Sequence, residues 1–321
     1  MDRNLALEVV RATEAAALAS ARLMGRGDRN AVRQAAAEAM RQALSDVAIR
    51  GEIVLGEGPA AQATVLGAGD LVGKCREGDV ELEIALDPLD GAQLCATGGT
   101  NAVSAIAMGE PGQLLRAPDA HMEKLAVGPG ARGAIDLRRP PTENLARIAD
   151  ALGKYVEDLT VVILDRPRHV KLIQLVREAG ARIKLLTDGD LAGALGTCIP
   201  ECGIDVLMGI GGAREGVISA AAVRCVGGDM QGRLVFRNEA ERERARARGP
   251  KDPDRVMTAE DMAGGSVMFA ATGVTSGDAL EGVVFTGDGA RTHSTVMRSR
   301  TGTVRFIDTI HHFTRRPNYG W

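Results

Sequence analysis

Aromatic residues are scarce in this chain of 321 residues, where Phe, Trp and Tyr together make up 2% of the sequence. Proteins that bind single-stranded nucleic acids stack bases on aromatic rings, so this shortage argues against such a ligand. The formal net charge is −3, from 39 basic and 42 acidic residues. That balance argues against a strongly basic nucleic-acid-binding protein, and we expect no nucleic-acid partner.

Long hydrophobic runs and a secretion signal are also missing. No apolar stretch approaches the roughly 18–20 residues that a membrane span needs, and the first four residues, Met1-Asp2-Arg3-Asn4, lack the layout of a signal peptide. The five cysteines are scattered and odd in number, which indicates no disulfide framework. With 45% hydrophobic residues, the chain has enough material for a large core. We expect a globular cytoplasmic protein with no membrane partner.

The spacing of apolar residues predicts an α/β protein. In the first half we expect helices over 5–24 and 30–44 and strands over 52–55, 80–86 and 101–108. In the second half strands and helices alternate, which is typical of a buried, partly parallel sheet. There we expect strands over 159–164, 182–186 and 205–208 and helices over 168–179, 191–198 and 215–225. Residues 239–255 favour a solvated loop or a frayed helix, and strands follow from 267.

A change of pattern near residue 157 predicts two subdomains. Residues 1–157 would form an N-terminal metal-binding subdomain, and residues 158–321 a C-terminal α/β subdomain that binds a sugar phosphate. We expect the strands at the end of the chain to pack back on the second half.

Two acidic motifs follow predicted strands. One is Asp87-Pro88-Leu89-Asp90-Gly91, and the other is Gly56-Glu57-Gly58. Proline favours extended geometry in the residue before it, and glycine permits a sharp turn. The pattern predicts that three carboxylates share one small space, where they would suit a hard cation such as Mg²⁺ or Mn²⁺. Acidic surface turns without a metal are the plainer alternative.

These motifs belong to a longer series that resembles class II fructose-1,6-bisphosphatase, the bacterial branch of the lithium-sensitive sugar and inositol phosphatases. The matching segments occur in order along nearly the whole chain. They include Gly25-Arg26-Gly27-Asp28, Ile53 to Gly58, Asp87 to Gly91, Ala117-Pro118-Asp119, Met122-Glu123-Lys124, Val127 to Ala131, Pro167-Arg168-His169, Asp188-Gly189-Asp190, Gly209 to Ala213, Glu215-Gly216-Val217 and Ala271-Thr272-Gly273-Val274.

The resemblance implies a layered α/β/α/β/α sandwich and a phosphoric monoester hydrolase of carbohydrate metabolism, such as gluconeogenesis. Members of the family hydrolyse the 1-phosphate of fructose 1,6-bisphosphate, and some that of sedoheptulose 1,7-bisphosphate. By position, the ligands of Mg²⁺ or Mn²⁺ would be Glu57, Asp87, Asp90 and Glu215. The resemblance also implies a homo-oligomer.

Substrate contacts also follow from the resemblance. The positions are Asp90, Gly91, Ala92, His121, Arg166, Pro167, Arg168, Asp188, Gly189, Asp190 and Gly212. Three of them differ from the usual residue: Asp90 replaces Glu, Arg166 replaces Lys and His121 replaces Tyr. The arginines are suited to the remote phosphate of a bisphosphate, and Asp188 and Asp190 to sugar hydroxyls. The plainer alternatives are that the two arginines are solvated residues at a helix start and that Asp188-Gly189-Asp190 is a simple turn.

The chain departs from the family at the residues that activate water. Arg33 stands where the family has Asp, and Ala92 where it has the Thr whose hydroxyl works with that Asp. Ala61 replaces a further Asp that is important for activity. We therefore assign no general base. His121 is one candidate for acid–base chemistry, and a neutral histidine that only shapes the pocket is the plainer alternative.

These departures leave three functions open. The first is hydrolysis of a sugar bisphosphate, slow or with an altered substrate. The second is a catalytically impaired paralogue that binds a sugar phosphate in a regulatory role. The third and weakest is altered chemistry, such as isomerisation of a sugar phosphate.

Overall fold

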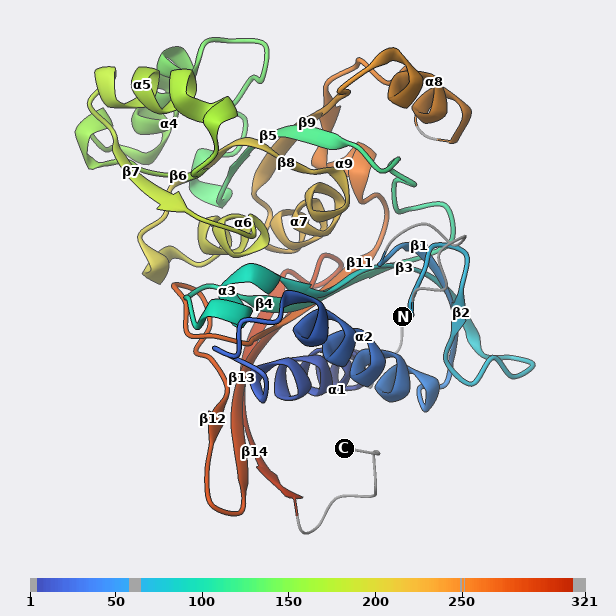
Figure 1. The fold of residues 1–321 in the computed structure, drawn as a ribbon. Helices are drawn as coiled ribbons and strands as arrows, with labels where there is room; N and C mark the ends of the chain where they lie inside the picture. Colours follow the sequence, from blue (N-terminus) through green and yellow to red (C-terminus); the bar gives the residue numbers. More distant parts are fainter. Residues whose placement is uncertain (1–4, 58–64, 249, 251, 314–321) are drawn as a thin grey trace.

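The computed structural model describes residues 5–57, 65–248, 250 and 252–313. Helices and strands alternate in layers in this part of the chain (Figure 1). The helices are α1 (Leu5–Ala21), α2 (Arg29–Ser45), α3 (Ala92–Thr97), α4 (Pro141–Leu152), α5 (Val170–Glu178), α6 (Leu191–Cys198), α7 (Ala213–Val226), α8 (Glu239–Arg248) and α9 (Ala259–Met262). The strands are β1 (Ile49–Leu55), β2 (Leu71–Val72), β3 (Val80–Asp90), β4 (Val103–Gly109), β5 (His121–Val127), β6 (Thr160–Leu164), β7 (Arg182–Leu186), β8 (Val206–Gly212), β9 (Asp229–Val235), β10 (Met257–Thr258), β11 (Val267–Gly273), β12 (Val284–Phe285), β13 (Gly289–Arg298) and β14 (Thr303–His312).

The strands of the described residues form two sheets. The first has the order β12-β13-β11-β4-β3-β1-β2, with β14 paired to β13. Only β1 and β3 are parallel neighbours there, and the other pairs are antiparallel. The second has the order β10-β9-β5-β8-β6-β7. In it β6 runs parallel to β7 and β8, as the alternating pattern predicts.

Five layers result from the packing of helices on these sheets. Helices α1 and α2 cover one face of the first sheet, α6 and α7 lie between the sheets, and α4 and α5 cover the far face of the second sheet (Figure 1). Three clusters of buried apolar side chains fill the spaces between layers. The predicted α/β/α/β/α sandwich is therefore confirmed.

The path of the chain differs from the prediction in two respects. The C-terminal strands pack against α7 of the second half, but they pair with the first half: β11 pairs with β4, and β13 and β14 extend the first sheet. Strand β5 precedes residue 157 but lies in the middle of the second sheet, between β8 and β9. The sheets thus draw strands from both sides of the expected boundary, and the division into two subdomains stays a prediction.

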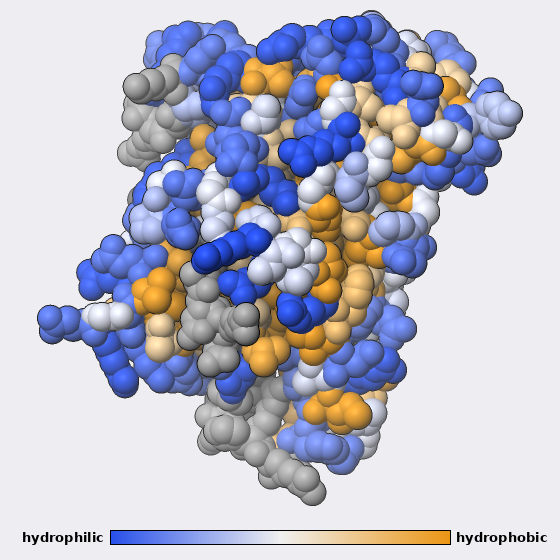
Figure 2. Space-filling model, turned by 180° about the vertical axis from the view of Figure 1, so that it is seen from behind, coloured by the Kyte–Doolittle hydropathy of each residue, from blue (hydrophilic) through white to orange (hydrophobic). Residues whose placement is uncertain are grey.

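The surface is mixed in character. Hydrophobic residues form a band through the middle of the face seen in Figure 2, and hydrophilic residues dominate its upper end. No helix in the described ranges combines the length and the apolar composition needed to cross a membrane.

Candidate functional site

One cavity of about 300 Å³ brings the predicted site residues together. It lies where β1, β3, β6, β7 and β8 end and where α3 and α7 begin. Its lining residues are Arg29, Arg33, Glu57, Asp87, Leu89, Asp90, Gly91, Ala92, His121, Leu164, Arg166, Arg168, Asp188, Gly189, Asp190, Gly211, Gly212, Arg214 and Glu215. Of the predicted positions, Pro167 is not in this lining, and Ala61 lies outside the described residues.

Arg214 stands at the centre of the acidic half of the cavity. Its Nη2 lies 2.8 Å from Oδ2 of Asp87 and 2.9 Å from Oε1 of Glu215. Its Nη1 lies 3.2 Å from Oε1 of Glu57 and 3.0 Å from the carbonyl oxygen of Gly56, and Nε lies 3.1 Å from the same Glu215 oxygen. Three predicted metal ligands from separate segments of the chain, Glu57, Asp87 and Glu215, therefore converge, but they converge on a guanidinium group.

Sequence reasoning missed Arg214, although a signal was present. The residue lies between two quoted motifs, directly before Glu215 and in the first turn of α7. A cation is unfavourable at the positive end of a helix, so an arginine there indicates a nearby cluster of anions. Burial lowers the pKa of Arg214, but Asp87, Glu215 and Glu57 together raise it well above its usual value. Arg214 is therefore a permanent cation.

Glu215 folds back against the glycine-rich end of β8. A Cβ atom on Gly212 would collide with the Glu215 carboxylate, so glycine is required at this close approach. Burial raises the pKa of Glu215, but the charges of Arg214 and Lys124 outweigh burial and bring this pKa to about 2. Glu215 is therefore an anion at neutral pH.

Arg33 reaches the same cluster from α2. The carboxylate of Asp28 accepts hydrogen bonds from Asn30 N and Ala31 N, each at 3.0 Å, and so begins this helix. One turn later, the Arg33 guanidinium pairs with Oε2 of Glu57. The structure therefore places the Arg33 guanidinium beside Glu57 in the cavity lining.

The two aspartates of β3 are both buried in the cavity wall. Burial raises the pKa of Asp87 to about 7, although Arg214 opposes the shift. Burial and the neighbouring Asp87 and Asp190 raise the pKa of Asp90 well above its usual value. Asp90 Oδ2 also accepts a hydrogen bond of 3.0 Å from Leu191 N at the start of α6, so this side chain has a structural partner.

The residues present do not offer an open metal site. No group of three or more His, Cys, Asp or Glu side chains in the described ranges is arranged to hold a metal ion. Residues 58–64, which lie outside the described residues, read GPAAQAT in the sequence and include none of these residue types. The carboxylates of Glu57, Asp87 and Glu215 are instead hydrogen-bonded to arginine, which does not fit the oxygen cage of a divalent cation.

The opposite half of the cavity is basic. Arg166 donates to the carbonyl oxygens of Asp165 and Thr187 at 3.1 and 2.6 Å, and its Nη2 lies 3.2 Å from Oδ1 of Asp188. Arg168 donates from Nε and Nη2 to the carbonyl oxygen of Ile210, at 3.1 and 2.6 Å. These backbone contacts hold two guanidinium groups beside the cavity.

Lys124 is a second residue that sequence reasoning left without a role. It is a buried lysine on β5, 1% exposed. Its ammonium group pairs with Asp190 and donates to the carbonyl oxygen of Gly212 at 3.0 Å. Gly211 makes room, since a Cβ there would collide with Asp190 and approach Lys124. Asp190 thus lines the cavity with its carboxylate already neutralised.

His121 begins β5, opposite Gly212 on β8, and also lines the cavity. Burial and the charges of Arg168 and Arg237 lower the pKa of His121. A neutral ring at physiological pH fits the pocket-shaping role weighed for this residue, and its part in acid–base chemistry stays a prediction.

His169 is a buried residue next to the basic half of the cavity, and it links β6 to β8 through hydrogen bonds. Its Nε2 accepts from Ile210 N at 2.7 Å, so Nδ1 carries the hydrogen and donates to the carbonyl oxygen of Leu164, also at 2.7 Å. The ring is 1% exposed. Burial lowers the pKa of His169, and the hydrogen bond to Leu164 opposes this shift only in part.

This buried histidine predicts a dependence of stability on pH. Below about pH 6.5 the unfolded chain takes up a proton at His169 that the folded chain does not, so the free energy of unfolding falls as pH falls. His169→Gln removes this contribution, and urea titrations at pH 7.5 and 5.5 measure it. The control His312→Gln alters an exposed ring and keeps the wild-type difference. An unchanged pH dependence in His169→Gln would contradict the assignment.

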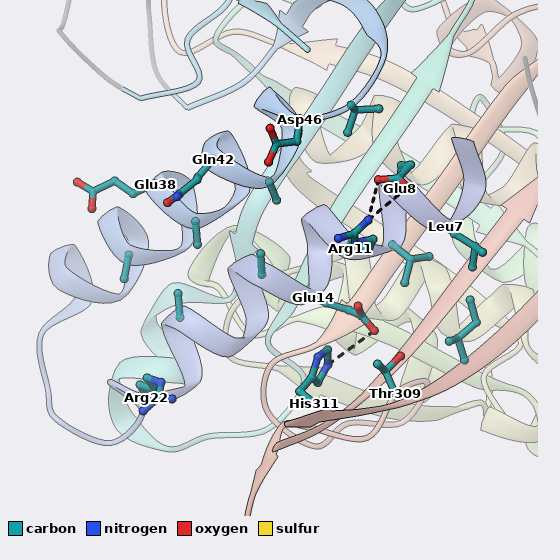
Figure 3. A pocket seen from close by; sticks show the side chains of 18 of the residues that line it. Leu7, Glu8, Arg11, Glu14, Arg22, Glu38, Gln42, Asp46, Thr309 and His311 are labelled. Atoms are coloured by element: carbon teal, nitrogen blue, oxygen red, sulfur yellow. Dashed lines mark hydrogen bonds and ion pairs between the residues drawn. The ribbon is translucent and has the colours of Figure 1, made fainter. Parts of the chain in front are cut away.

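A second, larger cavity of about 1100 Å³ lies between α1, α2 and β14 (Figure 3). Alanine, leucine and valine side chains contribute much of its lining. Inside it, the Glu14 carboxylate and the His311 ring approach to 3.9 Å. None of the predicted site residues lines this cavity, so the cavity at the strand ends is the candidate site.

The five-layer fold and a cavity that combines a carboxylate cluster with several arginines define a protein of the sugar phosphatase class. A family model described as "Bacterial fructose-1,6-bisphosphatase, glpX-encoded" matches residues 3–311. The chain belongs to this family of phosphoric monoester hydrolases.

Several curated relatives cover nearly the whole chain and carry the name "D-fructose 1,6-bisphosphatase class 2/sedoheptulose 1,7-bisphosphatase". The relative from Synechococcus sp. (strain JA-3-3Ab) is 47% identical over 334 residues, which covers 97% of this chain and 96% of the relative. The relative from Synechocystis sp. (strain ATCC 27184 / PCC 6803 / Kazusa) is 43% identical, with 97% of each chain covered. The predicted family is therefore confirmed.

Proposed function

We propose that this chain hydrolyses a phosphate ester of a sugar bisphosphate of the fructose 1,6- or sedoheptulose 1,7-bisphosphate type. The observation that carries the proposal is the single cavity with cationic groups at both ends: Arg33 and Arg214 on one side, Arg166 and Arg168 on the other. A bisphosphate has two anionic ends joined by a polar sugar, and guanidinium groups are suited to phosphate.

The basic half is the proposed site of the phosphate that is not cleaved. Arg166 and Arg168 are fixed by backbone carbonyls, so little conformational freedom is lost when they bind an anion. The Asp188 carboxylate accepts hydrogen bonds from Arg166 and, at 3.3 Å, from Gln93 N. These contacts hold it at the cavity wall, where it would lie beside a bound sugar. The opposite half, with Arg214 and Arg33, would face the reacting phosphoryl group.

The expected metal is part of the family resemblance. A bound Mg²⁺ or Mn²⁺ would polarise the ester and activate water. In this chain the candidate ligands are Glu57, Asp87, Asp90 and Glu215, and three of them are hydrogen-bonded to Arg214. This arrangement does not fit a divalent cation. We expect turnover to be slow, since Ala92 and Arg33 provide neither hydroxyl nor base.

Phosphate release from fructose 1,6- and sedoheptulose 1,7-bisphosphate tests the proposal, with and without Mn²⁺. Arg168→Ala removes a charge-assisted phosphate contact worth roughly 1.5–3 kcal/mol, so we expect KM to rise about 10- to 100-fold with little change in kcat. The matched control is Arg177→Ala, an exposed arginine on α5. Wild-type turnover no higher than that of Glu57→Ala would refute hydrolysis.

The second candidate function is binding of a sugar phosphate without turnover. It is favoured by the two arginines among the carboxylates and by the missing hydroxyl at Ala92. Titration calorimetry with fructose 1,6-bisphosphate separates the two functions, because binding without phosphate release supports the second. A cytoplasmic location and a homo-oligomeric state complete the proposal, and size-exclusion chromatography with light scattering measures the latter.

A further inference from the structure

We infer that Arg214 is the resident cation of the acidic cluster and holds Glu57, Asp87 and Glu215 in place of a divalent metal ion. The identity of the ligand, a phosphorylated sugar, rests on the proposed function. The claim about the cation does not, because it concerns only the contacts of one guanidinium group with three carboxylates.

All the hydrogen-bonding capacity of this guanidinium group is directed at the cluster. An arginine side chain has five N–H donors, and five hydrogen bonds are formed: two to Glu215 and one each to Asp87, Glu57 and the Gly56 carbonyl. A planar fork that is satisfied in this way is fixed in position. The side chain is 22% exposed, and that of Asp87 only 2%.

In Glu57 and Asp87, the carboxylate oxygen that does not contact Arg214 also has a partner. Glu57 Oε2 pairs with Arg33, and Asp87 Oδ1 accepts from Leu89 N at 3.1 Å. A divalent cation bound here would have to displace Arg214 and then remain beside Arg33. Two fixed positive charges already offset two of the three negative charges, so the attraction for a further cation is small.

The rest of the site agrees with a resident arginine. At Ala92, where the family has Thr, no hydroxyl faces the cluster, and the residues 58–64 bring no additional carboxylate. An arginine in the first turn of α7 has a cost against the helix dipole, which the three carboxylates offset. The arrangement is self-consistent as a closed ion-pair cluster in which every N–H donor of Arg214 already has an acceptor.

Manganese titration tests this inference without an activity assay. We expect the wild-type protein to bind MnCl₂ at least tenfold more weakly than Arg214→Ala, as measured by calorimetry and by the EPR signal of free Mn²⁺. The double variant Arg214→Ala/Glu57→Gln should lose the tighter Mn²⁺ binding that Arg214→Ala acquires. Arg29→Ala removes another positive charge from the cavity lining but frees no carboxylate, so we expect it to bind Mn²⁺ as the wild type does.

A second measurement needs no variant and remains informative if Arg214→Ala fails to fold. The wild type should bind fructose 1,6-bisphosphate with the same Kd in EDTA as in MnCl₂. A wild-type protein that binds Mn²⁺ as tightly as Arg214→Ala, or that loses the sugar bisphosphate in EDTA, would overturn the inference. Absence of phosphate release would refute the proposed hydrolysis but leave the role of Arg214 intact.

Discussion

The triple variant Arg33→Asp/Ala92→Thr/Arg214→Ala is expected to release phosphate from fructose 1,6-bisphosphate about 10²- to 10⁴-fold faster than the wild type in MnCl₂. A positioned general base contributes a factor of this size. Arg33 pairs with Glu57 and Arg214 hydrogen-bonds to Asp87, so the two arginines occupy the carboxylates that the reaction would use. Arg33→Asp and Ala92→Thr supply the carboxylate and the hydroxyl that the chain lacks, and Arg214→Ala releases the cluster.

Partial variants show which change limits the rate. Arg33→Asp/Ala92→Thr retains Arg214, so we expect less than a tenfold gain. Arg214→Ala alone frees Asp87 and Glu215 but leaves Glu57 paired with Arg33 and supplies no base, and the same small gain is expected. Steady-state phosphate release with each variant, alongside the Mn²⁺ titration, separates the two contributions. A full gain from Arg33→Asp/Ala92→Thr alone would show that Arg214 does not obstruct the cluster.

Much of the site was predictable because it depends on strand ends. Glu57 follows β1 and Asp87 lies near the carboxyl end of β3, and the carboxyl ends of neighbouring parallel strands meet at one edge of a sheet. Strands β1 and β3 are such neighbours, so the two carboxylates come together as expected. Glu215 was predicted as a ligand only by the resemblance to the family, and its carboxylate joins the same cluster.

The parts that were missed depend on contacts distant in sequence. Strand β5 carries Glu123 and Lys124 in its middle, which hides its apolar period, and Lys124 is buried only because Asp190 lies against it. The pairing of β11 with β4 joins residues more than 150 positions apart, and nothing local in either strand specifies it. Arg214 was overlooked because the motif on each side of it matched.

Lys124→Met is expected to lower the free energy of unfolding by about 3–5 kcal/mol, because it leaves Asp190 as a buried and unpaired charge. Lys124 is 1% exposed and Asp190 4%, so water cannot replace the lost partner. The control is Lys154→Met, whose ammonium group pairs with Asp205 and is 42% exposed. That variant should lose about 0–1 kcal/mol. Urea unfolding followed by circular dichroism measures both.

A double variant shows whether the effect belongs to the ion pair. Lys124→Met/Asp190→Asn removes both charges, so its loss should be smaller than the sum of the two single losses, with a coupling of about 0.5–3 kcal/mol. If Asp190 served mainly to hold a sugar hydroxyl, Lys124→Met would raise KM and change stability no more than Lys154→Met does. The carboxylate bonded to Lys124 beneath Gly211 argues for the first outcome, since a charge so deeply buried must be paired before it can contribute to binding.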